Sequence, residues 1–287
     1  MIRRTGLIAA AACLIAVLFL VVHQHRVRAL FESDSEFGRV RVVERGDGLR
    51  SLYTGEGRAR QSALYPGRPM HLEHPYTQVG MIGLALVPPD ARILFVGLGG
   101  GAMPTYTHHV MPRARIDVVE IDPIIVDVAE RFFGFAPDDR MAVHTGDGRA
   151  FIESAPPGRY DLIVLDAFSD DEVPYSLTTR QFLAAVRTAL TADGVVVSNL
   201  WTAAPAYPRM LATYGAVFDQ VNLVRVPQRA QRILVGTNGR TLDRNALVAA
   251  ARALAGRTDL GFDLAGLVEE GYETLATPDA AVLEDRP

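Results

Sequence analysis

The chain has 287 residues, of which 49% are hydrophobic and 22% charged, so it can bury one large core beside a smaller unit. Its net charge of −4 excludes a general nucleic-acid binder, because such a protein needs a basic surface to displace phosphate counterions. The single cysteine, Cys13, excludes an intrachain disulfide.

The N-terminus carries an uncharged apolar run of 17 residues, Gly6 to Val22, directly after two arginines. A membrane-spanning helix needs about 17–25 such residues, so residues 1–28 are expected to form a single-pass anchor in the cell membrane. A cleaved signal peptide is the alternative, but it favours a shorter core and a small-residue cleavage site. Two arginines before the run favour a cytoplasmic N-terminus, whereas the larger number after it favours a cytoplasmic location for the remaining chain, which is the orientation expected here.

Residues 36–74 alternate short extended segments with glycine turns at 46–48 and 55–57, which predicts a small β domain or lid. Residues 75–87 are apolar enough for a helix, and the two prolines that follow end it.

From residue 91 onward, apolar strands alternate with helical stretches, which predicts right-handed crossovers and a parallel sheet. Strands are expected at 92–96, 116–121, 141–144, 160–166 and 194–200, and helices at 102–110, 124–133, 149–153, 178–190 and 205–218.

Two further strands, 220–226 and 232–237, should form an antiparallel hairpin because only a short loop separates them. The whole is the layout of a class I methyltransferase-like Rossmann fold, an α/β fold with a mostly parallel seven-stranded sheet. It is expected over residues 75–256, ending in a helix at 244–255 and followed by a loose tail over 257–287.

A glycine-rich turn follows the first strand and includes Gly97, Gly99, Gly100 and Gly101. Ligands of open parallel sheets bind beyond the carboxyl ends of the strands, where glycines let the backbone approach a nucleotide. Simple tight packing is the alternative.

Two acidic residues end the next strands. Glu120 lies about 20 residues beyond the glycines, where a carboxylate accepts hydrogen bonds from ribose hydroxyls of either NAD or an adenosyl-sulfonium cofactor. Asp147, followed by Gly148, is placed to accept from an adenine amino group, or else to cap a helix. NAD-binding folds lack this second element, which favours sulfonium chemistry.

The fourth strand ends in a cluster of carboxylates: Asp166, Asp170, Asp171 and Glu172. Like charges at the mouth of a nucleotide site repel one another and need a reason. A cationic amine substrate, a metal and a solvated loop are the alternatives. The amine fits best, and no metal is expected because the histidine pairs at 71/74 and 108/109 lack a third ligand.

In this order, "GLGGGA", "VVEID", "GDGRAFI" and "YDLIVLDAFSDDEVP" resemble the spermidine synthase (polyamine aminopropyltransferase) family, over about residues 50–240. The likeness is to a divergent, membrane-anchored member. It implies that Gln61 contacts the cofactor and Tyr76 lies near the substrate. It assigns Glu120 to the ribose, Asp147 to the adenine, and Asp166 to the first acid after the fourth strand.

The resemblance implies transfer of a 3-aminopropyl group from decarboxylated S-adenosylmethionine to an amine such as putrescine, with release of methylthioadenosine. A carboxylate after the fourth strand then orients the amine and removes its proton. Asp170, Asp166 and Asp171 are the catalytic candidates, while Tyr76, Asp170 and Glu172 are the candidates for binding the amine. A small-molecule amine is the expected partner, together with a second copy of the chain in a homodimer.

The chain departs from the family at three points. Gly100 replaces the aspartate of the family's glycine turn, which helps to hold the cationic end of the decarboxylated cofactor. Ser169 occupies the position of the catalytic aspartate unless one residue is inserted, which brings Asp170 there. Thr77 and Gln78 follow the tyrosine where the family has an acid. An S-adenosylmethionine-dependent methyltransferase and a non-catalytic nucleotide or polyamine sensor are therefore the alternative functions.

Overall fold

The computed structural model describes residues 26–55, 60–168, 172–275 and 278–286. The expected membrane anchor, up to residue 25, lies outside the described residues, and residues 27 and 28 belong to the first strand instead. In the described part of the chain, no helix has both the length and the apolar character needed to span a bilayer.

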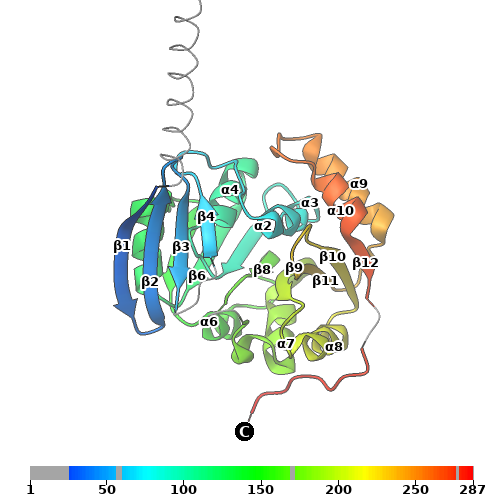
Figure 1. Cartoon of the computed structure of the whole chain (residues 1–287). Helices are drawn as coiled ribbons and strands as arrows, with labels where there is room; N and C mark the ends of the chain where they lie inside the picture. Colours follow the sequence, from blue (N-terminus) through cyan, green and yellow to red (C-terminus); the bar gives the residue numbers. More distant parts are fainter. Residues whose placement is uncertain (1–25, 56–59, 169–171, 276–277, 287) are drawn as a thin grey trace, which may run out of the picture.

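Two sheets form the scaffold (Figure 1). The smaller sheet is antiparallel, with its strands in chain order: β1 (Val27–Ser35), β2 (Gly38–Arg45), β3 (Arg50–Thr54) and β4 (Arg60–Leu64). Gly48, with φ 87°, lies in the turn between β2 and β3, which confirms the first predicted glycine turn. The second predicted turn includes residues 56–59, which lie outside the described residues.

The larger sheet has eight strands in the order β12-β10-β11-β9-β8-β5-β6-β7. Its strands are β5 (Arg92–Val96), β6 (Arg115–Glu120), β7 (Met141–Thr145), β8 (Tyr160–Leu165), β9 (Leu190–Trp201), β10 (Gln220–Arg225), β11 (Gln231–Thr237) and β12 (Tyr272–Thr274). Strands β5 to β9 pair in parallel, and β10 and β11 form the predicted antiparallel hairpin against β9.

Helices cover both faces of this sheet (Figure 1). They are α2 (Pro75–Gly80), α3 (Ile82–Ala85), α4 (Ala102–Val110), α5 (Pro123–Val128), η1 (Ala129–Phe133), α6 (Gly148–Ser154), η2 (Tyr175–Leu177), α7 (Arg180–Ala189), α8 (Tyr207–Val217), α9 (Arg244–Ala255) and α10 (Leu264–Gly271).

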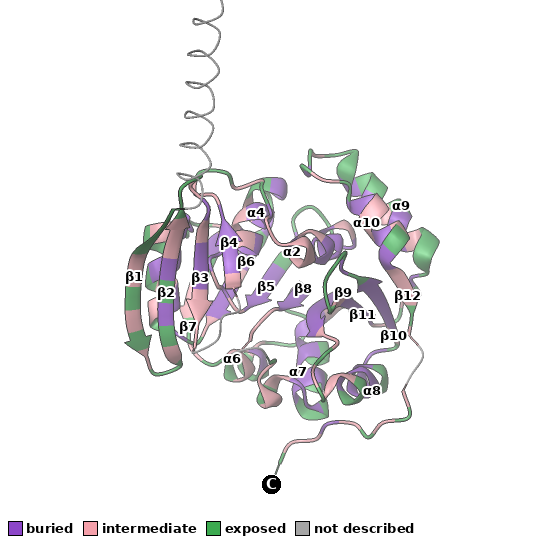
Figure 2. Ribbon diagram, in the orientation of Figure 1, coloured by how far each residue is buried: buried purple, intermediate pink, exposed green. Residues whose placement is uncertain are grey.

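The side chains of β5 show why both faces must be covered. Ile93 and Phe95 point into a core that α2 to α5, α9 and α10 share with the small sheet. Leu94 and Val96 point into a second core, formed with α6, α7 and α8. Alternate residues of a strand face opposite sides, so a strand buried on both sides becomes a continuous apolar run. Figure 2 accordingly shows the central strands as buried.

Three predictions about this fold need correction. The sheet has eight strands rather than seven, because β12 pairs with the outer edge of β10. The single helix expected at 75–87 is two short helices, α2 and α3, which meet at Met81. The segment 257–287 is not a loose tail, since it contains α10 and β12 and ends in an extended stretch whose Leu283 is 1% exposed.

The burial of α10 gives a stability prediction. Leu264 is 1% exposed in the core against α9, so Leu264→Ala should lower the free energy of unfolding by about 2–5 kcal/mol in urea titration. The exposed Glu270 of the same helix is the matched control, and Glu270→Ala should change stability by no more than about 0.5 kcal/mol. Equal, small effects would contradict the packing of α10.

Candidate active site

A cavity of about 340 Å³ lies between the small sheet and the carboxyl ends of β5, β6 and β8. The small sheet lines it from β2, β3 and β4, and the large sheet lines it from the loops that follow its strands. All parallel strands of an open sheet end at the same edge, so the predicted motifs converge there although they are far apart in sequence. Of the predicted residues, this lining includes Gln61, Tyr76, Gly97, Gly99, Glu120, Asp147, Gly148 and Asp166.

The first glycine of the turn is required by close packing. Gly97 has φ +97°, and a Cβ atom there would lie 2.6 Å from the carbonyl oxygen of Asp166. Gly99 also lines the cavity with a positive φ, whereas a Cβ at Gly101 would point at the ring of Phe135. The turn therefore combines both interpretations of the sequence: Gly97 and Gly99 face the cavity, and Gly101 allows tight packing.

Gly100, the position of the missing aspartate, faces the small sheet rather than the cavity. A Cβ atom there would lie 2.8 Å from Ser62 Oγ and 3.2 Å from the ring of Phe133. Gly100 is not among the residues that line the cavity. A side chain at this position would require the Ser62 hydroxyl of β4 to move and the Phe133 ring to give slightly.

Glu120 at the end of β6 holds the turn in place. One of its oxygens accepts from the backbone N–H of Leu98 at 2.9 Å, and the other from that of Asp122 at 3.1 Å. Burial raises the pKa of Glu120 above its usual value, and these N–H groups oppose that shift. The carboxylate keeps free lone pairs and lines the cavity.

Asp147 caps a helix, which is one of its two predicted roles, and it also lies in the cavity lining. Its Oδ1 accepts from the backbone N–H of Ala150 at 2.7 Å, which caps α6, and the residue also lines the cavity. Gly148 follows because a Cβ atom there would lie 2.7 Å from Val96 Cγ1 of β5. The cap thus fixes the position of a carboxylate at the edge of the cavity.

Asp166, directly after β8, is held by two neutral side chains. The Tyr76 hydroxyl donates to Oδ2 at 3.3 Å, and the Asn199 amide donates to Oδ1 at 3.0 Å. Burial raises the pKa of Asp166 to about 7, although both hydrogen bonds favour the ionised form. Burial and the nearby Asp166 charge raise the pKa of Tyr76 well above its usual value, so the phenol stays a hydrogen-bond donor.

Sequence reasoning missed the two amides behind this carboxylate. Asn199 of β9 donates to Asp166 and accepts from the Gln231 amide of β11 at 3.1 Å, so the hairpin fixes its orientation. The sequence feature that could have indicated them is the polar pair Ser198–Asn199 within an otherwise apolar strand. Both residues are buried, and a buried amide needs partners.

The acidic loop is only partly described. Asp170 and Asp171 lie outside the described residues. Glu172 is exposed and is not among the residues lining the cavity. Tyr76 and Asp166 are therefore the described members of the predicted catalytic and amine-binding set that meet at the cavity.

The described lining of the cavity is electronegative. It contains the carboxyl groups of Glu120, Asp122, Asp147 and Asp166, and no lysine or arginine. His74 also lines it, and burial together with the charge of Arg60 lowers its pKa to about 4, so it is neutral near pH 7. The arrangement favours a cationic ligand.

Comparison with known proteins gives a family and a fold. Residues 77–229 match the Spermine/spermidine synthase domain. A polyamine aminopropyltransferase of Vibrio vulnificus is 37% identical over 184 residues, which cover 63% of this chain and 62% of the relative. The chain therefore spans just under two thirds of that relative's length.

Two solved structures resemble the fold. A probable spermidine synthase of Corynebacterium glutamicum superposes with a TM-score of 0.69 at 21% identity, covering 90% of this chain and 99% of the other. Human methyltransferase-like protein 13, in complex with SAH, gives a TM-score of 0.59 at 32% identity, covering 66% and 95%. The methyltransferase-like Rossmann fold expected from the sequence is confirmed.

The raised pKa of Asp166 predicts a pH-dependent stability. The usual pKa of an aspartate is 3.8, and that of Asp166 in the folded chain is about 7. Between these two pH values the folded chain keeps a proton that the unfolded chain releases, so the free energy of unfolding falls as pH rises. Asp166→Asn removes this loss. From pH 5 to pH 8, the variant should gain about 1–3 kcal/mol in unfolding free energy relative to the wild type, measured by urea titration at each pH. A constant difference would contradict the raised pKa.

Proposed function

The chain belongs to the spermine/spermidine synthase family, and from that premise we propose that it transfers a 3-aminopropyl group from decarboxylated S-adenosylmethionine to a small amine such as putrescine. Methylthioadenosine is the other product. The single observation that carries this proposal is the charge of the cavity, whose described lining has four carboxyl groups and no lysine or arginine.

That charge favours the decarboxylated co-substrate. Its tail ends in an ammonium, whereas the tail of intact S-adenosylmethionine also carries a carboxylate. A carboxylate in this cavity would face like charges in a described lining that has no lysine or arginine, and such burial is unfavourable. The acceptor amine, which is protonated in water, suits the same surroundings.

The adenosine half would bind at the ends of β6 and β7. We assign Glu120 to the ribose hydroxyls and Asp147 to the adenine amino group, and the position of both carboxyl groups in the cavity lining supports this assignment. Ile121 lines the cavity beside Glu120 and is 41% exposed, so it offers an apolar surface to a planar base. Gln61 approaches the cavity from β4 and is proposed as a further contact to the co-substrate.

The chemistry needs a deprotonated amine. Its nitrogen attacks the carbon next to the sulfonium, the new N–C bond forms as the C–S bond breaks, and the sulfur leaves as a neutral thioether. An ammonium with a pKa near that of lysine, about 10.4, must first give up a proton. We propose Asp166 as the group that holds the amine and accepts that proton, supported by its pKa of about 7 and its hydrogen bonds from Tyr76 and Asn199.

The acidic loop after Asp166 belongs to the same proposal. Asp170 and Asp171 stay candidates for the base, and Glu172 for binding the far end of a polyamine. Residues on both sides of this loop line the cavity: Asp166 comes before it, and Pro174, Ser176 and Leu177 come after it. The loop therefore begins and ends beside the proposed acceptor site.

Methyl transfer from intact S-adenosylmethionine is the second candidate. It is favoured by the 32% identity to human methyltransferase-like protein 13, whose structure contains SAH. The two candidates share the fold, the adenosine site and the nucleophilic nitrogen. They differ in the group that is transferred.

Product analysis separates the candidates. The purified full chain, given decarboxylated S-adenosylmethionine and a panel of diamines, should release methylthioadenosine, and Asp166→Asn should lower kcat/KM by about 10²–10⁴-fold. Asp219→Asn, at an ion pair with Arg187 that does not line the cavity, is the control and should keep wild-type activity. Release of S-adenosylhomocysteine from intact cofactor, with no methylthioadenosine from the decarboxylated one, would overturn the first candidate.

A further inference from the structure

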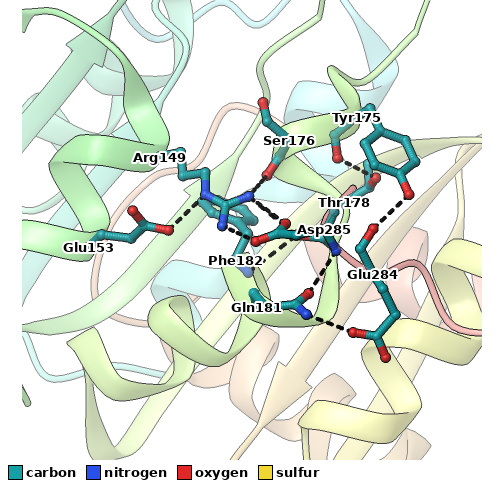
Figure 3. A network of polar contacts seen from close by, with 10 residues as sticks. Arg149, Glu153, Tyr175, Ser176, Thr178, Gln181, Phe182, Glu284 and Asp285 are labelled. Atoms are coloured by element: carbon teal, nitrogen blue, oxygen red, sulfur yellow. Dashed lines mark hydrogen bonds and ion pairs between the residues drawn. The ribbon is translucent and has the colours of Figure 1, made fainter. Parts of the chain in front are cut away.

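Arg149, at the start of α6, joins three separate parts of the chain. Its two terminal nitrogens donate to the Asp285 carboxylate at 2.7 and 2.6 Å. One of them also donates to the carbonyl oxygen of Ser176 at 3.2 Å, and Nε donates to Glu153 at 2.7 Å (Figure 3). A bidentate, charge-assisted pair of this kind fixes geometry better than a single contact.

Asp285 lies in the C-terminal strap, which we define as residues 279–286. The strap runs in extended form across the α7 and α8 side of the domain (Figure 1). It is anchored at Leu283, which is 1% exposed in the second core. The backbone N–H of Leu283 donates to Thr213 Oγ1 at 2.9 Å, and its carbonyl accepts from the N–H of Arg180 at 2.7 Å.

The strap also holds the η2 turn. The Tyr175 hydroxyl donates to the carbonyl oxygen of Glu284 at 2.7 Å, and the guanidinium of Arg286 lies 4.3 Å from the centre of the Tyr175 ring. Gln181 fixes the strap from α7, because its amide donates to Glu284 and accepts from the N–H of Asp285 (Figure 3).

The contacts of Arg149 and the strap involve residues next to, or within, two walls of the cavity. On one side, Asp147 and Gly148 line it immediately before Arg149. On the other side, Ser176 lines it and gives its carbonyl oxygen to Arg149. The adenine-side wall and the loop after the acidic cluster are thus joined through one guanidinium and one carboxylate. The guanidinium also holds the pKa of Asp285 at about 2, so the pair stays ionised at neutral pH.

We propose that Arg149 and Asp285 are positioning residues, and that the C-terminal strap uses them to hold the loop at 174–177 against the adenine-side wall of the cavity. Neither residue touches the reacting atoms. The effect on ligands rests on the proposed function, because it is the adenosyl co-substrate that would lie against both walls. The fixed spacing of the walls does not depend on that assignment.

Asp285→Asn tests the proposal, because it removes the charge while keeping the size of the side chain. Amide hydrogen exchange over residues 174–182 of the full chain should become about fivefold faster or more, since the η2 turn opens locally. The dissociation constant for methylthioadenosine, measured by calorimetry, should rise by about tenfold. Arg149→Lys should behave similarly, because lysine keeps the charge but lacks the planar fork.

The matched control is Asp219→Asn, which breaks an ion pair to Arg187 at 2.9 Å that does not line the cavity. It should leave both readouts at wild-type values, even if its thermal midpoint falls as much as that of Asp285→Asn. Unchanged exchange over 174–182 in Asp285→Asn would overturn the positioning role, as would equal changes in the control. If the wild type binds no methylthioadenosine, the proposed function fails, while the exchange comparison still decides the role of the strap.

Discussion

The close approach of three strand ends is the constraint on which the site depends. The N–H of Gly97 donates to the carbonyl of Val119 on β6, and the N–H of Asp166 donates to that of Val96 on β5, both at 2.9 Å. A side chain at position 97 would meet the carbonyl of Asp166 and force these ends apart. The same glycine therefore fixes the separation between the proposed ribose acid, Glu120, and the proposed proton acceptor, Asp166.

The second constraint is electrostatic. Carboxyl groups concentrated at one cavity are destabilising in the absence of ligand, and the chain tolerates them by different means. Glu120 accepts from two backbone N–H groups, which oppose the rise in its pKa caused by burial. Asp147 is exposed to solvent and caps α6. Asp166 has only neutral side-chain donors, Tyr76 and Asn199, and its pKa is raised towards neutrality. A carboxyl group with a pKa near neutrality can exchange a proton at physiological pH, which is what a site for proton transfer needs.

Much of this could be predicted from the sequence, because the signals are local. The alternation of strands and helices, the glycine turn and the acids at strand ends each depend on neighbouring residues. The two acids predicted to bind the cofactor, Glu120 and Asp147, and the glycines at 97 and 99 accordingly line the cavity. The contacts that were missed are long-range: Gln231 reaches Asn199 across a strand pair, and Asp285 reaches Arg149 over 136 positions of the chain. The three residues of β12 and the extended strap have no periodic pattern, so the sequence alone predicts a tail there.

Gly100 shows how structure changes an interpretation. From the sequence alone, Gly100 marks a missing acidic side chain, the one expected to bind the cationic end of the co-substrate. In the fold, that position points to Ser62 of the small sheet. The preference of the cavity for a cationic ligand must then come from the carboxyl groups that line it.

The most direct measurement is calorimetric titration of the wild-type chain with intact and decarboxylated S-adenosylmethionine in the same buffer. The decarboxylated compound should bind more tightly, and tighter binding of the intact cofactor would contradict the proposed role of the carboxyl groups.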